Sequence, residues 1–220
     1  MNATGPFTQN LWKIIQPVYE QIISCSYVQR LTDGTLPYNW FAHYLSQDVL
    51  YIIDDSRALA VTAARSANPD ETYFFIHLAK DGLDIERAMH NDFLKFFNIP
   101  ETTEKSPAFD AYARFLLYNA FNSPYPVAVA SLLPCFWIYY KAGEHIFRNS
   151  TGNNPYQKWI DTYSDNEYKE YTHRLIQITE NLGKMVDHNI SIQMMNTFVQ
   201  GVKFELSLFE EAAEQNVNQL

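Results

Sequence analysis

The sequence predicts an all-α protein, and three observations support this fold class. Apolar residues recur at spacings of three and four along most of the chain, which is typical of amphipathic helices. The alternation typical of β-strands never persists, and the chain of 220 residues holds only 7 glycines. Prolines and polar turn residues divide the periodic stretches into segments of helical length. We therefore predict one single-domain helical bundle over residues 1–220, with seven or eight helices.

Capping and turn residues mark the ends of the predicted helices. Asn68 is a good N-terminal cap, because Pro69 follows it at the first helical position. Ser164 and Glu167 fit a capping box, in which each side chain bonds the backbone of the other. Pro17 predicts a kink in the first helix. The predicted helices cover residues 7–27, 37–66, 68–97, 106–121, a helix or kinked pair between the turns at 123–126 and 151–155, then 156–160, 164–183 and 190–214.

Charge and composition exclude several classes of function. Twenty-five acidic residues against 16 basic ones give a net charge of -9, which argues against a nucleic-acid partner. No apolar run is long enough to span a membrane, and the first residues do not resemble a signal peptide. Two cysteines make neither a disulfide framework nor a zinc signature. We expect a soluble protein of the reducing cytoplasm.

Cys135 stands out because it directly follows Pro134 within a run of large aromatic residues. Proline is tolerated in the first turn of a helix, so Cys135 is predicted at a helix start or just past a proline kink. Free backbone N–H groups at a helix start lower the pKa of a thiol and favour a nucleophilic thiolate. A buried, inert cysteine is the alternative.

Two predicted helices carry an acid on their apolar stripe. Asp48 lies between Leu45 and Ile52, and Glu205 lies between Val202 and Phe209, with steps of 3 and 4 in both helices. Burying an unpaired carboxylate is costly, so such acids are paired, protonated or functional. Together with Cys135 and several tyrosines, they indicate a polar pocket inside the bundle.

Metal and nucleotide sites have weak support in the sequence. Glu86 and His90 share a helix face, but their spacing is not the Glu-x-x-His of ferritin-like di-iron proteins. The sequence has no P-loop, no G-x-G-x-x-G and no G-x-S-x-G motif. We expect neither a metal nor an organic cofactor.

One block of the chain, residues 130–140, reads Ala-Ser-Leu-Leu-Pro-Cys-Phe-Trp-Ile-Tyr-Tyr. This block resembles the core motif of the TenA family, the thiaminase II (aminopyrimidine aminohydrolase) enzymes. The other matching blocks are residues 33–37, 47–48, 86–90 and 155–163. The resemblance covers nearly the whole chain, and the spacing of the blocks also fits.

The resemblance implies a haem-oxygenase-like α-bundle that binds no haem, forms a homotetramer and holds a 4-amino-2-methylpyrimidine ring. It places the catalytic cysteine on Cys135, the catalytic glutamate on Glu205 and the pyrimidine-binding aspartate on Asp48. The pocket tyrosines that it implies are Tyr51, Tyr112, Tyr139 and Tyr163. The chain departs from the family pattern at residues 206–209, which are less aromatic than usual, and at Cys25-Ser26-Tyr27, where many members have His-Pro-Phe.

The expected reaction is hydrolysis of 4-amino-5-aminomethyl-2-methylpyrimidine, of thiamin, or of both, through a covalent cysteine adduct, for thiamin salvage. Two alternatives remain at this point. One is a thiamin- or pyrimidine-binding or regulatory protein without turnover. The other is a haem-oxygenase-like di-iron oxidase that would use Asp48, Glu86, His90 and other acids as ligands. The sequence leaves the roles of Cys25, Asp55 and His90 open.

Overall fold

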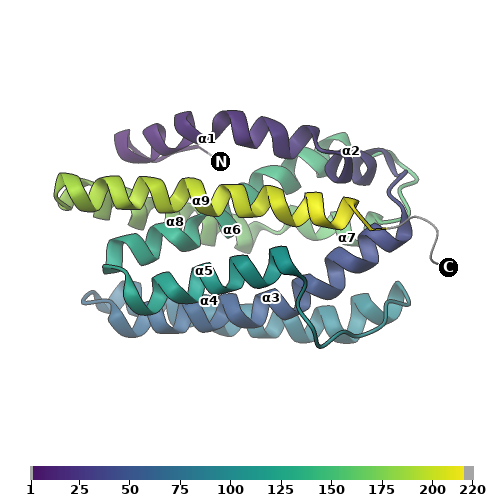
Figure 1. Cartoon of the computed structure of the whole chain (residues 1–220), viewed down its shortest axis with the longest axis horizontal. Coiled ribbons are helices and arrows are strands. Elements are labelled where there is room, and N and C mark those ends of the chain that lie inside the picture. Colours follow the sequence, from purple (N-terminus) through teal and green to yellow (C-terminus); the bar gives the residue numbers. More distant parts are fainter. Residues whose placement is uncertain (1, 216–220) are drawn as a thin grey trace.

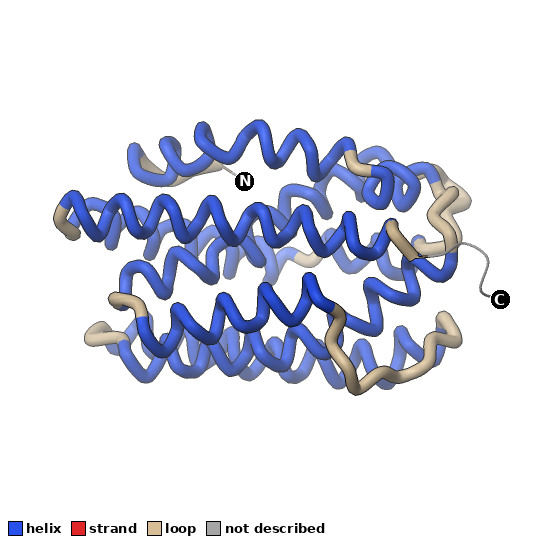
Figure 2. Tube along the Cα trace, viewed as in Figure 1, coloured by secondary structure: helices blue, strands red, loops and turns tan. Residues whose placement is uncertain are grey.

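The computed structural model describes residues 2–215, apart from the side chains of His90 and Ser164, and it confirms the all-α prediction. Over that range the chain forms α-helices and no strand. Figure 2 shows the helices joined by short loops. The α-helices are α1 Pro6–Ser24, α2 Ser26–Asp33, α3 Tyr38–Arg65, α4 Pro69–Ala88, α5 Pro107–Asn122, α6 Tyr125–Asn149, α7 Gln157–Ile160, α8 Asn166–Met185 and α9 His188–Ala213.

The long helices run roughly along one axis, so the molecule is an elongated bundle (Figure 1). Helix α3 packs along α4 and α5, while α6 packs against α8 and α9. Helix α1 covers α9 and α8. In Figure 1, α1 and α9 lie above α5, α3 and α4. Within the described range, no helix has both the length and the apolar character needed to cross a membrane.

Three helix ends differ from the sequence-based expectation. The first predicted helix, 7–27, is divided at Cys25, whose backbone is extended; α1 contains Pro17 and ends before Cys25, and α2 begins after it. The helix after Asn68 ends as α4 at Ala88 and continues as a π-helical segment, Met89–Leu94. At the start of α8, Asp165 is the cap instead of Ser164, because its Oδ1 accepts the Glu167 N–H at 2.8 Å.

The predicted start of α4 is confirmed in atomic detail. Asn68 Oδ1 accepts the backbone N–H of Asp70 at 2.9 Å, and Pro69 occupies the first turn. One continuous hydrophobic core then links the long helices. Because that core surrounds α6 on several sides, the middle of α6 lies deep in the molecule, and the residues around Cys135 are placed there.

Candidate active site

A cavity of about 550 Å³ opens inside the bundle between α3, α4, α6, α8 and α9. Most of the predicted site residues converge on it although they come from distant parts of the sequence. The predicted residues that line the cavity are Asp48, Tyr51, Cys135, Tyr139, Tyr163 and Glu205. The three residues expected to act in the reaction come from three helices: Asp48 from α3, Cys135 from α6 and Glu205 from α9.

Of the two positions expected for Cys135, the helix start is wrong, whereas a position directly after a proline within a helix agrees with the structure. Cys135 and Pro134 both lie in the middle of α6, and Pro134 is an internal proline of that helix. The Cys135 sulfur lies 2.9 Å from the Leu132 carbonyl oxygen and 3.5 Å from Asp55 Oδ1. The Tyr168 hydroxyl donates to the Cys135 backbone carbonyl at 2.8 Å. The thiol is half-buried and thus reachable from the cavity.

The electrostatics around Cys135 also differ from the expectation of a stabilised thiolate. Burial raises the pKa of the Cys135 thiol well above its ordinary value, and the carboxylates of Asp55 and Glu205 raise it further. No free helix N–H groups offset these effects, because the residue is in mid-helix. The thiol is therefore protonated at neutral pH, and a nucleophilic sulfur requires a base nearby.

The two acids that the sequence placed on apolar stripes are buried in this cavity. Burial raises the pKa of Asp48 to about 7, and the nearby Asp55 carboxylate adds to the effect. Burial likewise raises the pKa of Glu205 to about 8, while a hydrogen bond from the Tyr112 hydroxyl to Glu205 Oε1 at 2.8 Å opposes the shift. Carboxyl groups in this range can give and take protons near neutral pH.

Tyr112 differs from the other predicted pocket tyrosines. Its side chain is fully buried, and it is not among the residues that line the cavity. It lies behind Glu205, and its ring stacks on Phe204 with ring centroids 5.2 Å apart. Tyr112 is thus placed to hold the Glu205 carboxyl through its hydroxyl. Its ring is not in a position to contact a ligand in the cavity.

Tyr139 and Tyr163 form one wall of the cavity. Their rings meet edge to face with centroids 5.4 Å apart, and Trp159 Nε1 donates to the Tyr163 hydroxyl at 3.1 Å. The Tyr163 ring can lie directly on α6 because residue 143 is glycine: an added Cβ would come within 2.5 Å of the ring. The buried Tyr51 hydroxyl also lines the cavity, where it interacts with the Cys135 thiol and the Tyr112 hydroxyl.

The structure adds residues that sequence reasoning did not identify as part of the site. Asp55 lines the cavity beside Cys135, and its position seven residues after Asp48 on the same stripe was the available signal. Phe136 and Tyr168 line it as a stacked pair with centroids 5.8 Å apart, and no sequence pattern indicated this pair. Within the segment 206–209, which departs from the family pattern, Leu208 lines the cavity, whereas Phe209 stacks on Tyr44 in the core.

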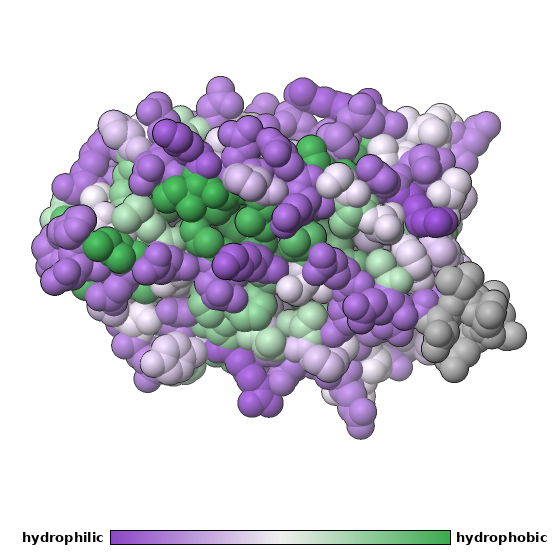
Figure 3. Space-filling view, turned by 45° about the horizontal axis from the view of Figure 1, so that its top comes forward, coloured by the Kyte–Doolittle hydropathy of each residue, from purple (hydrophilic) through white to green (hydrophobic). Residues whose placement is uncertain are grey.

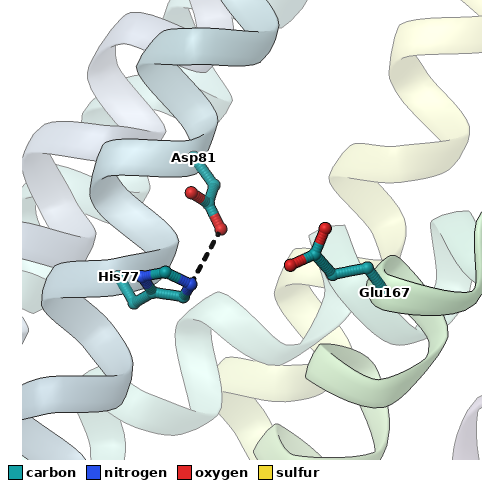
Figure 4. A group of neighbouring side chains, drawn as sticks. All are labelled: His77, Asp81 and Glu167. Carbon is teal, nitrogen blue, oxygen red and sulfur yellow. Dashed lines mark ion pairs between the residues drawn. The ribbon is translucent and has the colours of Figure 1, made fainter.

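The mouth of the cavity is acidic. Figure 4 shows Asp81 of α4 and Glu167 of α8 converging near His77, with their ligand-type atoms within 4.8 Å of one another. His77 Nε2 lies 3.5 Å from Asp81 Oδ2. The Tyr171 hydroxyl lies 2.8 Å from Asp81 Oδ2 and 2.6 Å from Glu167 Oε1, so it bridges the two acids.

The charged side chains among the described lining residues are all acidic. Among the described residues that line the cavity, none is Lys, Arg or His, while the acids are Asp48, Asp55, Asp81, Asp84, Asp165, Glu167 and Glu205. Such a lining attracts cations and repels phosphates. Of the ligands named for the di-iron alternative, Asp48 lines the cavity and Glu86 is not among the lining residues. The side chain of His90 lies outside what the structure describes.

Proteins with related sequences include two named aminopyrimidine aminohydrolases. That of Bacillus subtilis is 27% identical over 183 residues, which is 81% of this chain and 78% of the relative. That of Halalkalibacterium halodurans is 25% identical over 96% of this chain and 97% of its own. The thiamine biosynthesis multifunctional protein ThiED of Corynebacterium efficiens is 28% identical over 97% of this chain, which spans only 29% of that longer protein.

Solved structures show the same fold. A TenA homologue from P. horikoshii OT3 matches with a TM-score of 0.83 and 29% identity over 94% of this chain and 97% of its own. A domain from Shewanella denitrificans with a heme oxygenase-like fold matches with a TM-score of 0.74 and 8% identity over 96% of this chain and 94% of its own, which confirms the predicted haem-oxygenase-like bundle.

The family itself is shown by the sequence match, which covers residues 12–215 and so includes every residue of the cavity described above. This chain therefore belongs to the TENA/THI-4/PQQC family.

Proposed function

We propose that the protein is an aminopyrimidine aminohydrolase (thiaminase II) that releases 4-amino-5-hydroxymethyl-2-methylpyrimidine from 4-amino-5-aminomethyl-2-methylpyrimidine, from thiamin, or from both. The observation that carries the proposal is the convergence of Asp48, Cys135 and Glu205 on one cavity. Membership of the family and the names of the Bacillus and Halalkalibacterium relatives support it. The role in the cell would be salvage of the pyrimidine half of degraded thiamin.

The charge of the cavity agrees with these substrates. An aminomethyl group is protonated at neutral pH, and the thiazolium ring of thiamin carries a permanent positive charge. Both suit a lining with seven acids and, among the described residues, no basic side chain. Phosphorylated pyrimidines would be disfavoured by the same carboxylates, because like charges repel in a site of low dielectric constant.

In the proposed reaction, Asp48 hydrogen-bonds the ring nitrogen and the exocyclic amine of the pyrimidine. Its raised pKa suits the sharing of a proton with the ring, and a protonated ring is electron-poor. The Cys135 sulfur then forms a bond to a ring carbon, and the π electron pair moves onto the protonated ring nitrogen. Loss of aromaticity permits the C–N bond of the exocyclic methylene to break. This step divides one difficult displacement into two easier ones.

Glu205 serves both halves of the proposed reaction. Its raised pKa suits it to share one proton with the bound aminomethyl group, and that proton stays on the departing amine as the C–N bond breaks and leaves Glu205 as the carboxylate. The thiazole of thiamin departs as a neutral ring and needs no proton, so with thiamin Glu205 enters the reaction as the carboxylate. The resulting carboxylate then removes a proton from the water that adds to the methylene carbon. The C–S bond breaks, the ring regains aromaticity, and the hydroxymethylpyrimidine leaves. Tyr139 and Tyr163 would position the ring, while Tyr112 acts through its hydrogen bond to Glu205.

The test is the steady-state release of hydroxymethylpyrimidine from each substrate, with wild type and Cys135→Ala. We expect turnover by wild type and a loss of at least about 10³-fold in kcat/KM for the variant, because the nucleophile is gone. Cys25→Ser is the matched control. Cys25 lies between α1 and α2 and is not part of the cavity lining, so this change should leave turnover unaffected.

Two outcomes would contradict the proposal. Undiminished hydrolysis by Cys135→Ala would exclude the covalent route. Binding of both compounds by wild type without any release would instead favour a thiamin- or pyrimidine-binding protein that does not turn over its ligand.

A further inference from the structure

Asp55 is a buried acid with no part in the chemistry assigned to Asp48 and Glu205. It lies on α3 and has an exposed fraction of 9%. Its Oδ1 is 3.5 Å from the Cys135 sulfur, within the reach of an S–H···O hydrogen bond. The sulfur also contacts the Leu132 carbonyl oxygen and the Tyr51 hydroxyl. The carbonyl oxygen cannot take up the thiol proton, and a neutral hydroxyl is a far weaker base than a carboxylate.

The neighbouring acid on α3 shows what a structural carboxylate looks like in this protein. Asp54 is bound by Arg57 Nη1 at 2.7 Å and by the Lys105 ammonium group, so its charge is neutralised. Asp55 lines a cavity in which no described lining residue is basic. Burying a carboxyl group without a cation costs free energy, and such groups concentrate at functional sites.

We propose that Asp55 is the catalytic base that removes the thiol proton of Cys135 as the sulfur attacks the substrate. The inference rests on the proposed function, since it assigns a step of that reaction. The S–H bond breaks, the proton moves to Asp55 Oδ1, and the sulfur electron pair forms the C–S bond. When the C–S bond later breaks, its electron pair returns to the sulfur, which takes the proton back. Asp55 and Cys135 thus end each cycle unchanged.

The surroundings make such a base necessary. As described above, the thiol is protonated at neutral pH, and burial raises the pKa of Asp55 to about 7, although the hydrogen bond with Cys135 opposes this. A carboxyl group with this pKa is ionised in a large fraction of molecules at neutral pH. The titratable groups that interact with the pair are Asp48 and Tyr51 from α3, Tyr112 from α5, Tyr168 from α8 and Glu205 from α9. Among the described carboxyl groups, Asp55 has the hydrogen-bond contact with the sulfur.

The test measures the reactivity of Cys135 without any pyrimidine. Full-length Cys25→Ser protein, with Cys135 as its single thiol, is treated with iodoacetamide between pH 5.5 and 9.5, and modification of Cys135 is followed by mass spectrometry. With Asp55 present, we expect the rate to rise near pH 7, as Asp55 ionises. With Asp55→Asn, the rate at pH 8 should fall at least tenfold, and the rise should move above pH 9. Asp54→Asn is the matched control and should keep the profile with its rise near pH 7.

A rate at pH 8 that is equal or higher in Asp55→Asn would overturn the proposal. That result would mean that the Asp55 carboxylate only repels the thiolate, because removing its charge would then make the thiol more acidic. If Asp55→Asn does not fold, the pH profile of alkylation measured with Asp55 present still tests the proposal. An alkylation rate that begins to rise only above pH 9 excludes a carboxylate base.

The outcome is independent of the proposed substrate. If wild type releases no hydroxymethylpyrimidine but the alkylation profile depends on Asp55 as expected, the base assignment stands and the proposed reaction fails. If the hydroxymethylpyrimidine is released and the alkylation profile is the same with Asp55 and with Asp55→Asn, only the assignment of Asp55 as the base fails.

Discussion

At Glu205, one hydrogen bond links a carboxyl group of the cavity to a residue behind it. The Tyr112 hydroxyl donates to Oε1 at 2.8 Å, and both side chains are buried. A donor to the ionised form of a carboxyl group lowers its pKa, and here it partly offsets the increase caused by burial. Tyr112 therefore sets the proton affinity of the proposed acid without touching the ligand space.

We predict that Tyr112→Phe moves the basic limb of the pH profile of kcat/KM upward by about one pH unit, because a hydrogen bond to a charged group contributes roughly 1.5–3 kcal/mol. The sign follows from loss of the donor: the ionised form of Glu205 loses a partner, so its pKa rises. The measurement is the pH dependence of pyrimidine release. Tyr118→Phe is the control, since Tyr118 also lies on α5 but is 65% exposed. An unshifted profile in Tyr112→Phe would show that Glu205 is not the titrating group.

At the scale of elements, the contact between α6 and α9 sets the position of the cysteine. Pro134 lies inside α6, and Gly201 of α9 lies directly against its ring. A Cβ at residue 201 would come within 2.6 Å of Pro134 Cγ. Glycine at this position allows the two helices to approach closely next to Cys135.

Gly201→Ala is accordingly expected to destabilise the protein by about 1–2 kcal/mol. Overpacking typically costs about 1–3 kcal/mol, and the rigid proline ring leaves little room for relief, while the higher helix propensity of alanine returns up to about 1 kcal/mol. Urea unfolding measures this as a lower midpoint with an unchanged slope. Gly152→Ala serves for comparison, because nothing lies within 4 Å of a Cβ there. Equal midpoints for the two variants would refute the close-packing argument.

At the scale of the whole molecule, buried acids make stability depend on pH. Asp48, Asp55 and Glu205 have pKa values raised to about 7, 7 and 8 by burial. Between about pH 4 and 8 the folded protein therefore binds more protons than the unfolded chain. The stabilisation from these groups is complete below the unfolded pKa values and is lost as the pH rises through the folded ones.

We therefore expect the Tm of the empty protein to fall as the pH is raised from 5 to 8.5, as measured by calorimetry in buffers of equal ionic strength. Asp48→Asn should flatten this dependence, because the asparagine has no proton to lose. A Tm that increases over this range in wild type would contradict the raised pKa values. Acids with lowered pKa act in the opposite direction but at lower pH: at Asp54, for example, the ion pairs with Lys105 and Arg57 outweigh burial.

Exposed apolar side chains on the surface are relevant to whether the protein self-associates. Figure 3 shows apolar side chains gathered over the middle of one face between hydrophilic ones. Large apolar side chains that are exposed in the single chain include Ile14 of α1 and both Tyr118 and Phe121 of α5. The homotetramer implied by family resemblance stays a prediction. If the protein is a homotetramer, light scattering coupled to size-exclusion chromatography should give about four times the chain mass of 25.6 kDa. A mass near that of one chain would exclude the homotetramer.

The sequence alone predicted the helical bundle, because periodicity and capping residues act within a few residues of one another. It also singled out Asp48 and Glu205, since an acid on an apolar stripe is visible without coordinates, and Cys135 by its position after Pro134; the fold brings all three to one cavity. It left open what an interaction with the rest of the fold decides. Pro134 allowed either a helix start or a kink within a helix, and packing on several sides keeps α6 continuous through that proline.

Only the tertiary structure decided which side chains meet in the cavity. Asp55 and Cys135 are 80 residues apart in the sequence and in contact in the fold. Tyr112 lies behind Glu205, whereas Tyr168, on a largely polar helix, lines the cavity. The protonation of the thiol was likewise decided by the fold, because burial and charges from other helices set a pKa. Local sequence determines how the chain coils into helices, but the free energy of a buried charge depends on neighbours that packing brings together.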